Sequence, residues 1–382
     1  MKPYLISGER FYSLCESNLI KNFFLKASEV FESYGYDYIN LSYFEPYEYQ
    51  ELAFGEKAKE AITFKDSGSK EIFGLRLDFT TQVMRTVSSF RSIHLPQKLY
   101  YFGSLFSFDK KGFERLQTGV ELIGVKKTDA DVEVINALVD YLKEIGLKNL
   151  KVILSHANIV KKLSGKREEV IKSFSERNLE ELRGILGENL FEVLRISNEE
   201  EVLSSLDRFS LKEEKEVLIK VGNELTKMGI PFAYDIFEVR DFPYYTGVIF
   251  EIYDLDTLQA VAGGGRYDDL SGLFGRDFPA TGGAVYLEKL IDNLPKEVEK
   301  KDYFIIDRSK KGIGKKLADI LRKSGKKVSV DFTERDIKKS ISYAFGKGFR
   351  EVLVVDNEHL RVFSTPEEWV NMTIKEFLEL IK

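Results

Sequence analysis

Residues Lys98–Gly124 read KLYYFGSLFSFDKKGFERLQTGVELIG and decide the fold. Two runs of aromatic and aliphatic residues flank Asp109–Gly112, which is typical of a tight turn between antiparallel strands. Side chains alternate across a strand, so Gln117, Gly119 and Glu121 share one face. We interpret the glycine as opening a hollow between an amide and a carboxylate, which suits a small ligand with N–H donors. The alternative is a solvated strand face with a bulge glycine.

The rest of the first 293 residues adds helices to this hairpin. Apolar periodicity predicts helices over 17–34, 80–89, 130–144 and 283–293, with threonines capping the second. Strands are expected over 38–44, 72–78, 151–155, 232–238, 247–253 and 258–263. Residues 160–228 are rich in Lys, Glu and Leu without proline, which predicts a helical insertion. The plan is α+β, with a mainly antiparallel sheet.

A charged segment, residues 294–301, marks a domain boundary. Beyond it, strand and helix patterns alternate, which predicts a small α/β domain with a largely parallel sheet. We therefore expect a first domain over residues 1–295, including the insertion at about 160–228, and a second over 302–382.

Composition excludes several classes of protein. The net charge of −5 indicates no basic nucleic-acid-binding surface overall. The single cysteine, Cys15, rules out an intrachain disulfide and a cysteine zinc site, and His94, His156 and His359 are scattered. No signal-peptide core or run of about 18 apolar residues is seen, so a cytoplasmic protein without a membrane span is expected. Gly263–Gly265 lacks the Lys-Ser/Thr of a phosphate loop, and no metal or cofactor is expected.

Five blocks in this order resemble one family of class II aminoacyl-tRNA synthetase-like proteins. They are the stretch 75–80, the hairpin 98–124, and residues 130–135, 239–250 and 263–268. The blocks resemble histidyl-tRNA synthetases and their catalytically silent relatives, the regulatory subunits of ATP phosphoribosyltransferase. The resemblance covers roughly residues 15–293 and extends weakly through the C-terminal domain, which resembles an anticodon-binding fold.

The resemblance implies a histidine-binding pocket. Asp78 stands where the synthetases have a glutamate that binds the α-amino group, and Gln117 and Glu121 occupy positions that line the histidine site. The remaining matched positions are Thr80, Arg240, Tyr244, Tyr245 and Tyr267. Carboxylates suit an ammonium and an imidazole N–H, and aromatic walls suit a ring.

The ATP side departs from the synthetase pattern. Ser107 stands where the family has an arginine that holds the α-phosphate, and serine offers no fixed positive fork. Lys289 replaces a second ATP-binding arginine, and Tyr286 replaces a glycine. The hairpin loop is shorter by about four residues, and Ser42 replaces the proline of the dimer-forming motif. We interpret Ser107, Tyr286 and Lys289 as a degenerate ATP site, with no catalytic residues.

These departures favour the regulatory subunit over the synthetase. The resemblance then implies a non-catalytic chain that binds histidine. Such a chain activates or regulates a short-form ATP phosphoribosyltransferase catalytic subunit, which performs the first step of histidine biosynthesis. The resemblance implies a homodimer within a hetero-oligomer, a hetero-octamer by analogy. An active histidyl-tRNA synthetase is one alternative. A synthetase paralogue with another partner, including RNA, is the other, although Thr365–Glu368 and the overall charge give no clear RNA footprint.

Overall fold

The computed structural model describes residues 10–68, 70–109, 112–164, 173, 178–186, 201, 203–204, 206–235, 244–295, 300–309, 311–333, 335–357 and 359–381. The chain divides into two compact units, whose main parts are residues 20–294 and 295–382. Residues 13–19 group with the second unit. Within the described ranges, no helix is long and apolar enough to cross a membrane.

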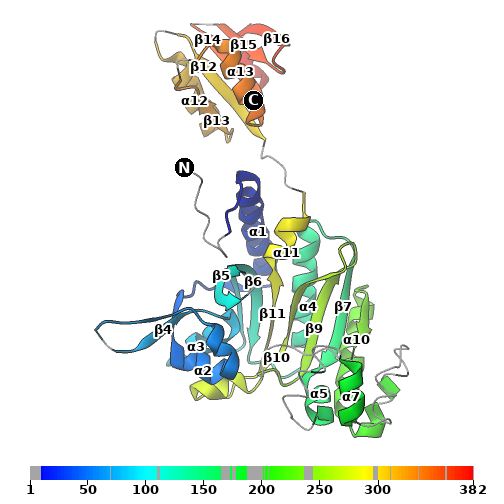
Figure 1. Ribbon diagram of the computed structural model, residues 1–382. Helices are drawn as coiled ribbons and strands as arrows, with labels where there is room; N and C mark the ends of the chain where they lie inside the picture. Colours follow the sequence, from blue (N-terminus) through cyan, green and yellow to red (C-terminus); the bar gives the residue numbers. More distant parts are fainter. Residues whose placement is uncertain are drawn as a thin grey trace. The chain divides into compact units, whose positions relative to one another are not determined.

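An eight-stranded sheet organises the first unit (Figure 1). Its spatial order is β1 (Asp37–Tyr38), β5 (Gln97–Asp109), β6 (Gly112–Ile123), β11 (Ala280–Tyr286), β10 (Gln259–Arg266), β9 (Val248–Asp254), β7 (Leu150–His156) and β8 (Phe232–Tyr234). Only the outermost pairs, β1 with β5 and β7 with β8, are parallel. Within the described strands the α+β expectation of a mainly antiparallel sheet is therefore confirmed.

A small antiparallel sheet and several helices complete this part of the chain. The small sheet has the order β2 (Phe44–Pro46), β4 (Ile72–Leu75) and β3 (Thr63–Lys65). The α-helices are α1 (Leu14–Ser33), α2 (Tyr47–Phe54), α3 (Phe79–Ser89), α4 (Asp129–Glu144), α5 (Ala157–Ser164), α7 (Leu179–Leu186), α10 (Lys212–Lys227) and α11 (Leu287–Asn293). Three 3₁₀ turns, η1 (Gly55–Glu60), η2 (Leu206–Phe209) and η3 (Leu270–Phe274), connect them.

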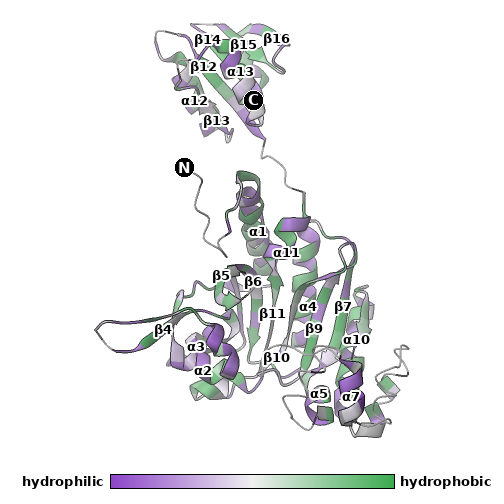
Figure 2. Cartoon of the chain, in the orientation of Figure 1, coloured by the Kyte–Doolittle hydropathy of each residue, from purple (hydrophilic) through white to green (hydrophobic). Residues whose placement is uncertain are grey.

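The two faces of the central hairpin have different neighbours. Tyr100 on β5 packs against Phe31 of α1, which also contacts Tyr141 of α4. The next residue, Tyr101, points to the opposite face and stacks on Phe79 of α3, with ring centroids 4.1 Å apart. Helices α1 and α4 thus cover one face, and the other carries the cavity described below. In Figure 2 hydrophobic stretches alternate with paler and hydrophilic ones along the central strands, as expected for a sheet that helices cover on one face.

The C-terminal unit is a five-stranded sheet with the order β13 (Val328–Val330), β12 (Lys301–Asp307), β14 (Phe349–Asp356), β15 (His359–Phe363) and β16 (Trp369–Thr373). Its helices are α12 (Ile313–Lys323), α13 (Ile337–Gly346) and α14 (Ile374–Leu380). The first three strands are parallel and the last two antiparallel, so the largely parallel expectation holds for one side of the sheet only. Apolar side chains of α12 and α14 fill one face, and those of α13 fill the other.

Several expected element boundaries are wrong. The predicted strand 38–44 is two short strands, β1 and β2, in different sheets. The predicted helix 283–293 begins only at Leu287, and its first four residues belong to strand β11. Asp78, not a threonine, caps α3, because its carboxylate accepts a hydrogen bond from the backbone N–H of Thr81 at 2.8 Å.

Candidate functional site

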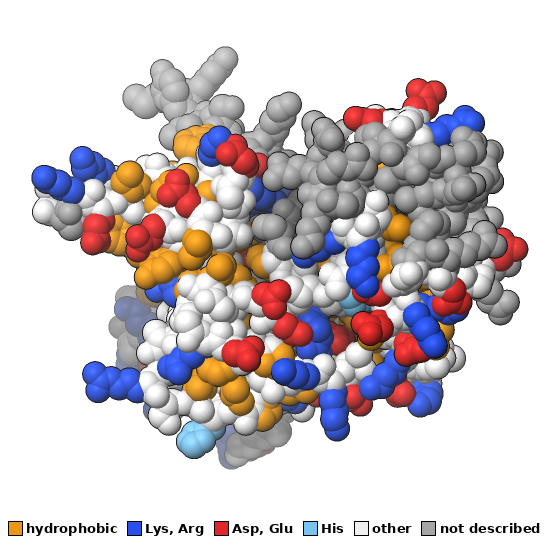
Figure 3. All heavy atoms as spheres, turned by 90° about the horizontal axis from the view of Figure 1, so that it is seen from below, with side chains coloured by type: hydrophobic (Ala, Val, Ile, Leu, Met, Phe, Trp, Pro, Cys, Tyr) orange, Lys and Arg blue, Asp and Glu red, His pale blue; other side chains and the backbone are white. Residues whose placement is uncertain are grey.

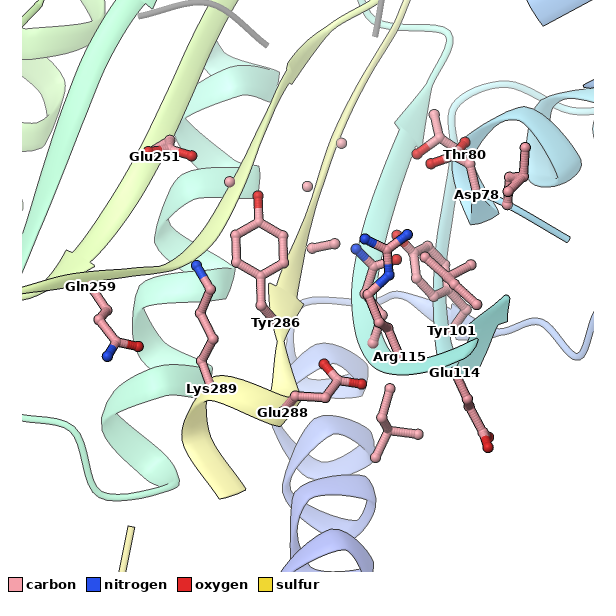
Figure 4. Close-up of a pocket in the computed structure, with 18 of the residues that line it drawn as sticks. Asp78, Thr80, Tyr101, Glu114, Arg115, Glu251, Gln259, Tyr286, Glu288 and Lys289 are labelled. Carbon is pink, nitrogen blue, oxygen red and sulfur yellow. The ribbon is translucent and has the colours of Figure 1, made fainter. Parts of the chain in front are cut away.

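A cavity of about 600 Å³ opens on the face of the sheet opposite α4. Residues of strands β5, β6, β11 and β10 line it, together with residues of α3 and α11 and residues 244–245. Figure 4 shows polar side chains entering it from several strands and from the start of α11. The site is therefore assembled from segments that lie far apart in the sequence.

Glu121 forms the deep end of this cluster. Its side chain is fully buried, and its Oε1 accepts a hydrogen bond from the Thr80 hydroxyl at 2.7 Å. The hydroxyl of Tyr267, on the segment after β10, donates to the other carboxylate oxygen. Burial raises the pKa of Glu121 to about 8, although both hydroxyls favour the charged form. Strand β6 thus presents a buried carboxyl group that accepts hydrogen bonds from two hydroxyls, and burial makes its charged form unfavourable in free energy.

Asp78 is the second buried carboxyl group. It ends the segment after β4, and its capping bond to Thr81 fixes it at the start of α3. The hydroxyl of Tyr244 also bonds to it, and burial raises its pKa above the ordinary range. Burial raises the pKa of the Tyr244 hydroxyl, and the nearby Asp78 and Glu121 carboxyl groups raise it further, which indicates that all three groups lie close together. Two acidic groups and a set of tyrosines therefore surround the deep end.

The hollow expected at Gly119 is not empty. Register pairs Gly119 of β6 with Tyr101 of β5, and a methyl group at Gly119 would lie 2.5 Å from the Tyr101 hydroxyl. It would lie equally close to the backbone oxygen of Gly283 on β11. The glycine therefore makes room for a tyrosine ring and a neighbouring strand, not for the ligand directly.

Glycines form the wall beside Glu121. Gly263 of β10 and Gly282 and Gly283 of β11 line the cavity, and strand pairing sets Gly282 beside Glu121. A methyl group at Gly282 would overlap the Glu121 carboxylate. This wall, which we call the glycine wall, leaves the cavity its width.

The outer part of the cavity contains Tyr286 and Lys289 of the predicted degenerate ATP site, and Ser107 reaches it only through a contact with Arg115. Ser107 is buried, and its hydroxyl accepts a hydrogen bond from the guanidinium of Arg115 at 3.1 Å. Lys289 donates to the backbone oxygen of Ala260 at 2.6 Å, and its ammonium lies 4.9 Å from the centre of the Tyr286 ring. Tyr286 and Lys289 line the cavity beside Arg115 (Figure 4). Lys289 is thus fixed by a hydrogen bond to the backbone of β10 and by its contact with the Tyr286 ring.

Two further polar side chains in the cavity have a buried oxygen without a hydrogen-bond partner among the described residues. Gln117 lines the cavity, and its buried Oε1 has no hydrogen-bond partner among the residues that the structure describes. The same holds for Oε1 of Glu288, whose pKa burial raises to about 7. Atoms of this kind point to a ligand or to water, because a buried polar atom without a partner is costly.

The structure brings together Asp78, Thr80, Gln117, Glu121, Tyr244, Tyr245 and Tyr267 around one end of the site. The remaining predicted residue, Arg240, lies outside the described residues. Sequence reasoning missed Tyr101 and Arg115, which both line the cavity. Pairing of the two hairpin strands could have placed Tyr101 opposite Gly119, since a glycine in a strand often faces a bulky neighbour.

Comparisons with known proteins identify the family. A family model described as histidyl-tRNA synthetase matches residues 8–290. A protein of Aquifex aeolicus described as an ATP phosphoribosyltransferase regulatory subunit is 60% identical over 383 aligned residues, covering all of both chains. The chain belongs to the ATP phosphoribosyltransferase regulatory subunits, within the histidyl-tRNA synthetase family.

This regulatory subunit of histidine biosynthesis has a non-catalytic role and implies a catalytic ATP phosphoribosyltransferase partner. It also resembles ligases of the same family. The histidine–tRNA ligase of Methanocaldococcus jannaschii is 34% identical over 366 residues, which cover 88% of this chain and 87% of the relative.

Solved structures show the same fold for the regulatory subunit. A histidyl-tRNA synthetase from Nostoc matches with a TM-score of 0.79 at 18% identity, covering 100% of this chain and 99% of the other. A Bacillus halodurans structure, described as an ATP phosphoribosyltransferase regulatory subunit/histidyl-tRNA synthetase, matches with a TM-score of 0.76 at 24% identity, covering 93% and 97%. The class II synthetase-like α+β fold is therefore confirmed.

Proposed function

We propose that the deep end of the cavity binds free histidine and that this binding regulates the catalytic partner. The observation that carries the proposal is the buried Glu121 carboxyl group, held between the hydroxyls of Thr80 and Tyr267. A carboxyl oxygen in this position can accept a hydrogen bond from an imidazole N–H, and tyrosine rings suit the faces of the imidazole.

The second carboxyl group suits the other end of the ligand. Asp78 has its pKa raised by burial, so it gains a great deal from a cationic partner. A histidine ammonium is such a partner, and the unpartnered Oε1 of Gln117 is an acceptor for a remaining N–H. Asp78, Gln117 and Glu121 thus account for the donors of one histidine molecule.

The proposal extends to the assembly. The regulatory subunit forms a homodimer within a hetero-oligomer, a hetero-octamer, with a short-form catalytic subunit in the cytoplasm. Histidine acts only if it binds two states of that assembly with different affinity, because equal binding shifts no equilibrium. RNA is not part of the proposal: the face in Figure 3 carries interspersed acidic and basic side chains rather than one continuous basic area.

Calorimetric titration of the purified chain with L-histidine tests the ligand. Glu121→Ala removes the buried acceptor, so we expect affinity to fall by about 5–150-fold, equivalent to about 1–3 kcal/mol. Gln259→Ala is the matched control, because Gln259 lines the same cavity but is exposed on β10. Equal affinity of wild type and Glu121→Ala would place the histidine site elsewhere.

A further inference from the structure

A second cavity of about 250 Å³ lies in the first unit, apart from the proposed histidine site. Strand β7 contributes His156, helix α10 contributes Glu214, and the segment before α4 contributes Lys126 and Thr128. The other lining residues are Asp131, Asn158, Glu213, Val217, residues 246–248, Arg266 and Asp268. Nothing in the proposed function uses this cavity.

One wall carries a carboxylate with an unused acceptor. Glu214 is 4% exposed, and its Oε1 pairs with the Lys162 ammonium at 2.6 Å. Its Oε2 is buried and finds no hydrogen-bond partner within the described part of the chain. A buried carboxylate oxygen without a donor costs free energy, so the cavity is suited to a ligand that carries N–H donors.

His156 supplies a donor beside this acceptor. The side chain is 7% exposed, and its Nδ1 accepts a hydrogen bond from the backbone N–H of Asn158 at 3.2 Å. Burial lowers the pKa of His156 to about 4, so the imidazole is neutral near pH 7. A neutral imidazole that accepts at Nδ1 carries its proton on Nε2. The cavity therefore holds an N–H donor as well as a carboxylate acceptor.

The start of α4 suits a negative group. Thr128 is the N-cap of this 16-residue helix, yet its hydroxyl makes no capping hydrogen bond. Helix N-termini favour anions, and Lys126, which also lines the cavity, adds a positive charge. The first turn of α4 also carries Asp129 and Asp131, but their charges are compensated by ion pairs with Lys220 and Arg266. Arg266 contributes little to binding, because Asp131, Asp268 and two backbone carbonyls already occupy its guanidinium.

We propose that this second cavity binds a free α-amino acid as its zwitterion. The ammonium lies against Glu214, and the carboxylate lies toward Thr128, Lys126 and the imidazole N–H of His156. The volume is below the range of about 300–1,000 Å³ usual for drug-sized ligands, which fits a molecule of amino-acid size. A metal ion fits poorly, because the described residues contain no cluster of three or more metal-ligating side chains.

Neighbouring residues of the same segments line the two cavities. Arg266, the last residue of β10, lines the second cavity, while the next residue, Tyr267, bonds to Glu121 in the first. Lys161 of α5 donates to the backbone oxygen of Tyr245, which lines the first cavity, and the adjacent Lys162 holds Glu214 in the second. Ligands in the two cavities therefore act on the same short segments, and we expect their binding to be coupled.

Isotope labelling at histidine Cε1 tests the proposal directly. The chain has only three histidines, so a His156→Gln variant assigns the His156 signal in the NMR spectrum of the full-length protein. Titrations use glycine, L-alanine, L-glutamate, L-lysine and L-histidine, with acetate and methylammonium as fragments. A Glu121→Ala background removes the contribution of histidine binding in the first cavity.

We expect at least one amino acid to shift the His156 signal saturably, and the two fragments to do so at least tenfold more weakly. Glu214→Gln should weaken that binding at least tenfold, while Glu216→Gln, an exposed glutamate on the same helix, should leave it unchanged. The proposal is wrong if no amino acid moves the signal, or if Glu214→Gln titrates like wild type. A shift by acetate or methylammonium equal to that by amino acids would likewise overturn the zwitterion assignment.

Discussion

Replacing Glu121 by glutamine should make the regulatory subunit more stable at alkaline pH. The wild-type carboxyl group is fully buried, and its pKa rises from 4.5 to about 8 on folding. Between these values the folded chain holds a proton that the unfolded chain releases. The free energy of unfolding must therefore fall as pH rises through this window.

The size of the effect follows from the shift. A difference of about 3.5 pH units at about 1.4 kcal/mol per unit corresponds to about 5 kcal/mol between pH 4 and pH 9. Glutamine has nearly the same shape and no charge, so Glu121→Gln should lack this component. At about 2 °C per kcal/mol, its melting temperature relative to wild type should rise by about 5–10 °C between pH 5 and pH 9.

Thermal unfolding of both proteins at pH 5, 7 and 9, without histidine, measures this difference. Other buried carboxyl groups, such as Asp78 and Asp131, titrate in both proteins, so the comparison isolates Glu121. Glu216→Gln, which alters an exposed carboxylate, should parallel wild type. Parallel pH profiles for Glu121→Gln and wild type would refute the argument that the buried carboxyl group carries this cost.

Three further outcomes are expected. The purified chain should show no histidine-dependent ATP–pyrophosphate exchange, since Ser107 and Lys289 cannot provide the charged hydrogen bonds to phosphate that two arginines would make, and robust exchange would contradict the degenerate ATP site. In a mixture with a short catalytic subunit, the chain should raise phosphoribosyltransferase activity; Asp78→Ala should reduce histidine sensitivity about 5–150-fold without preventing complex formation in gel filtration, and retained sensitivity would move the sensor to another site. Gly282→Ala should destabilise the chain by about 1–3 kcal/mol in chemical unfolding, because its methyl group overlaps Glu121, and an unchanged midpoint would contradict the tight glycine wall.

Sequence patterns were sufficient for the hairpin and for most strands of the first unit. The alternation on β6 correctly put Gln117 and Glu121 on the cavity face, because a long strand with one buried face leaves little freedom of register. The family resemblance predicted that Asp78 and Tyr267 belong to the same pocket. Local periodicity could not have done so, since the contacts join residues more than 140 positions apart.

Other features were out of reach for local patterns. The predicted helix 283–293 wrongly includes the second half of strand β11. The Ala-Thr-Gly-Gly-Ala run of this strand has little strand propensity and forms a strand only because it pairs with β6 and β10. The capping role of Asp78 was missed because two threonines follow it closely and are also good caps. The second cavity depends on a helix, a strand end and two loops that only the tertiary fold brings together.

The glycine wall limits how this binding site can change. A side chain at Gly282 would overlap Glu121, and one at Gly283 would lie 2.8 Å from Leu138 of α4. On β10, a side chain at Gly264 would meet the backbone of β11, so substitutions on these two strands disturb the packing before they can reshape the cavity. New ligand preferences must arise on the opposite side, from the start of α3, from β6 or from residues 244–245. A mutational library aimed at a sensor for another amino acid should therefore vary those three segments and leave β10 and β11 untouched.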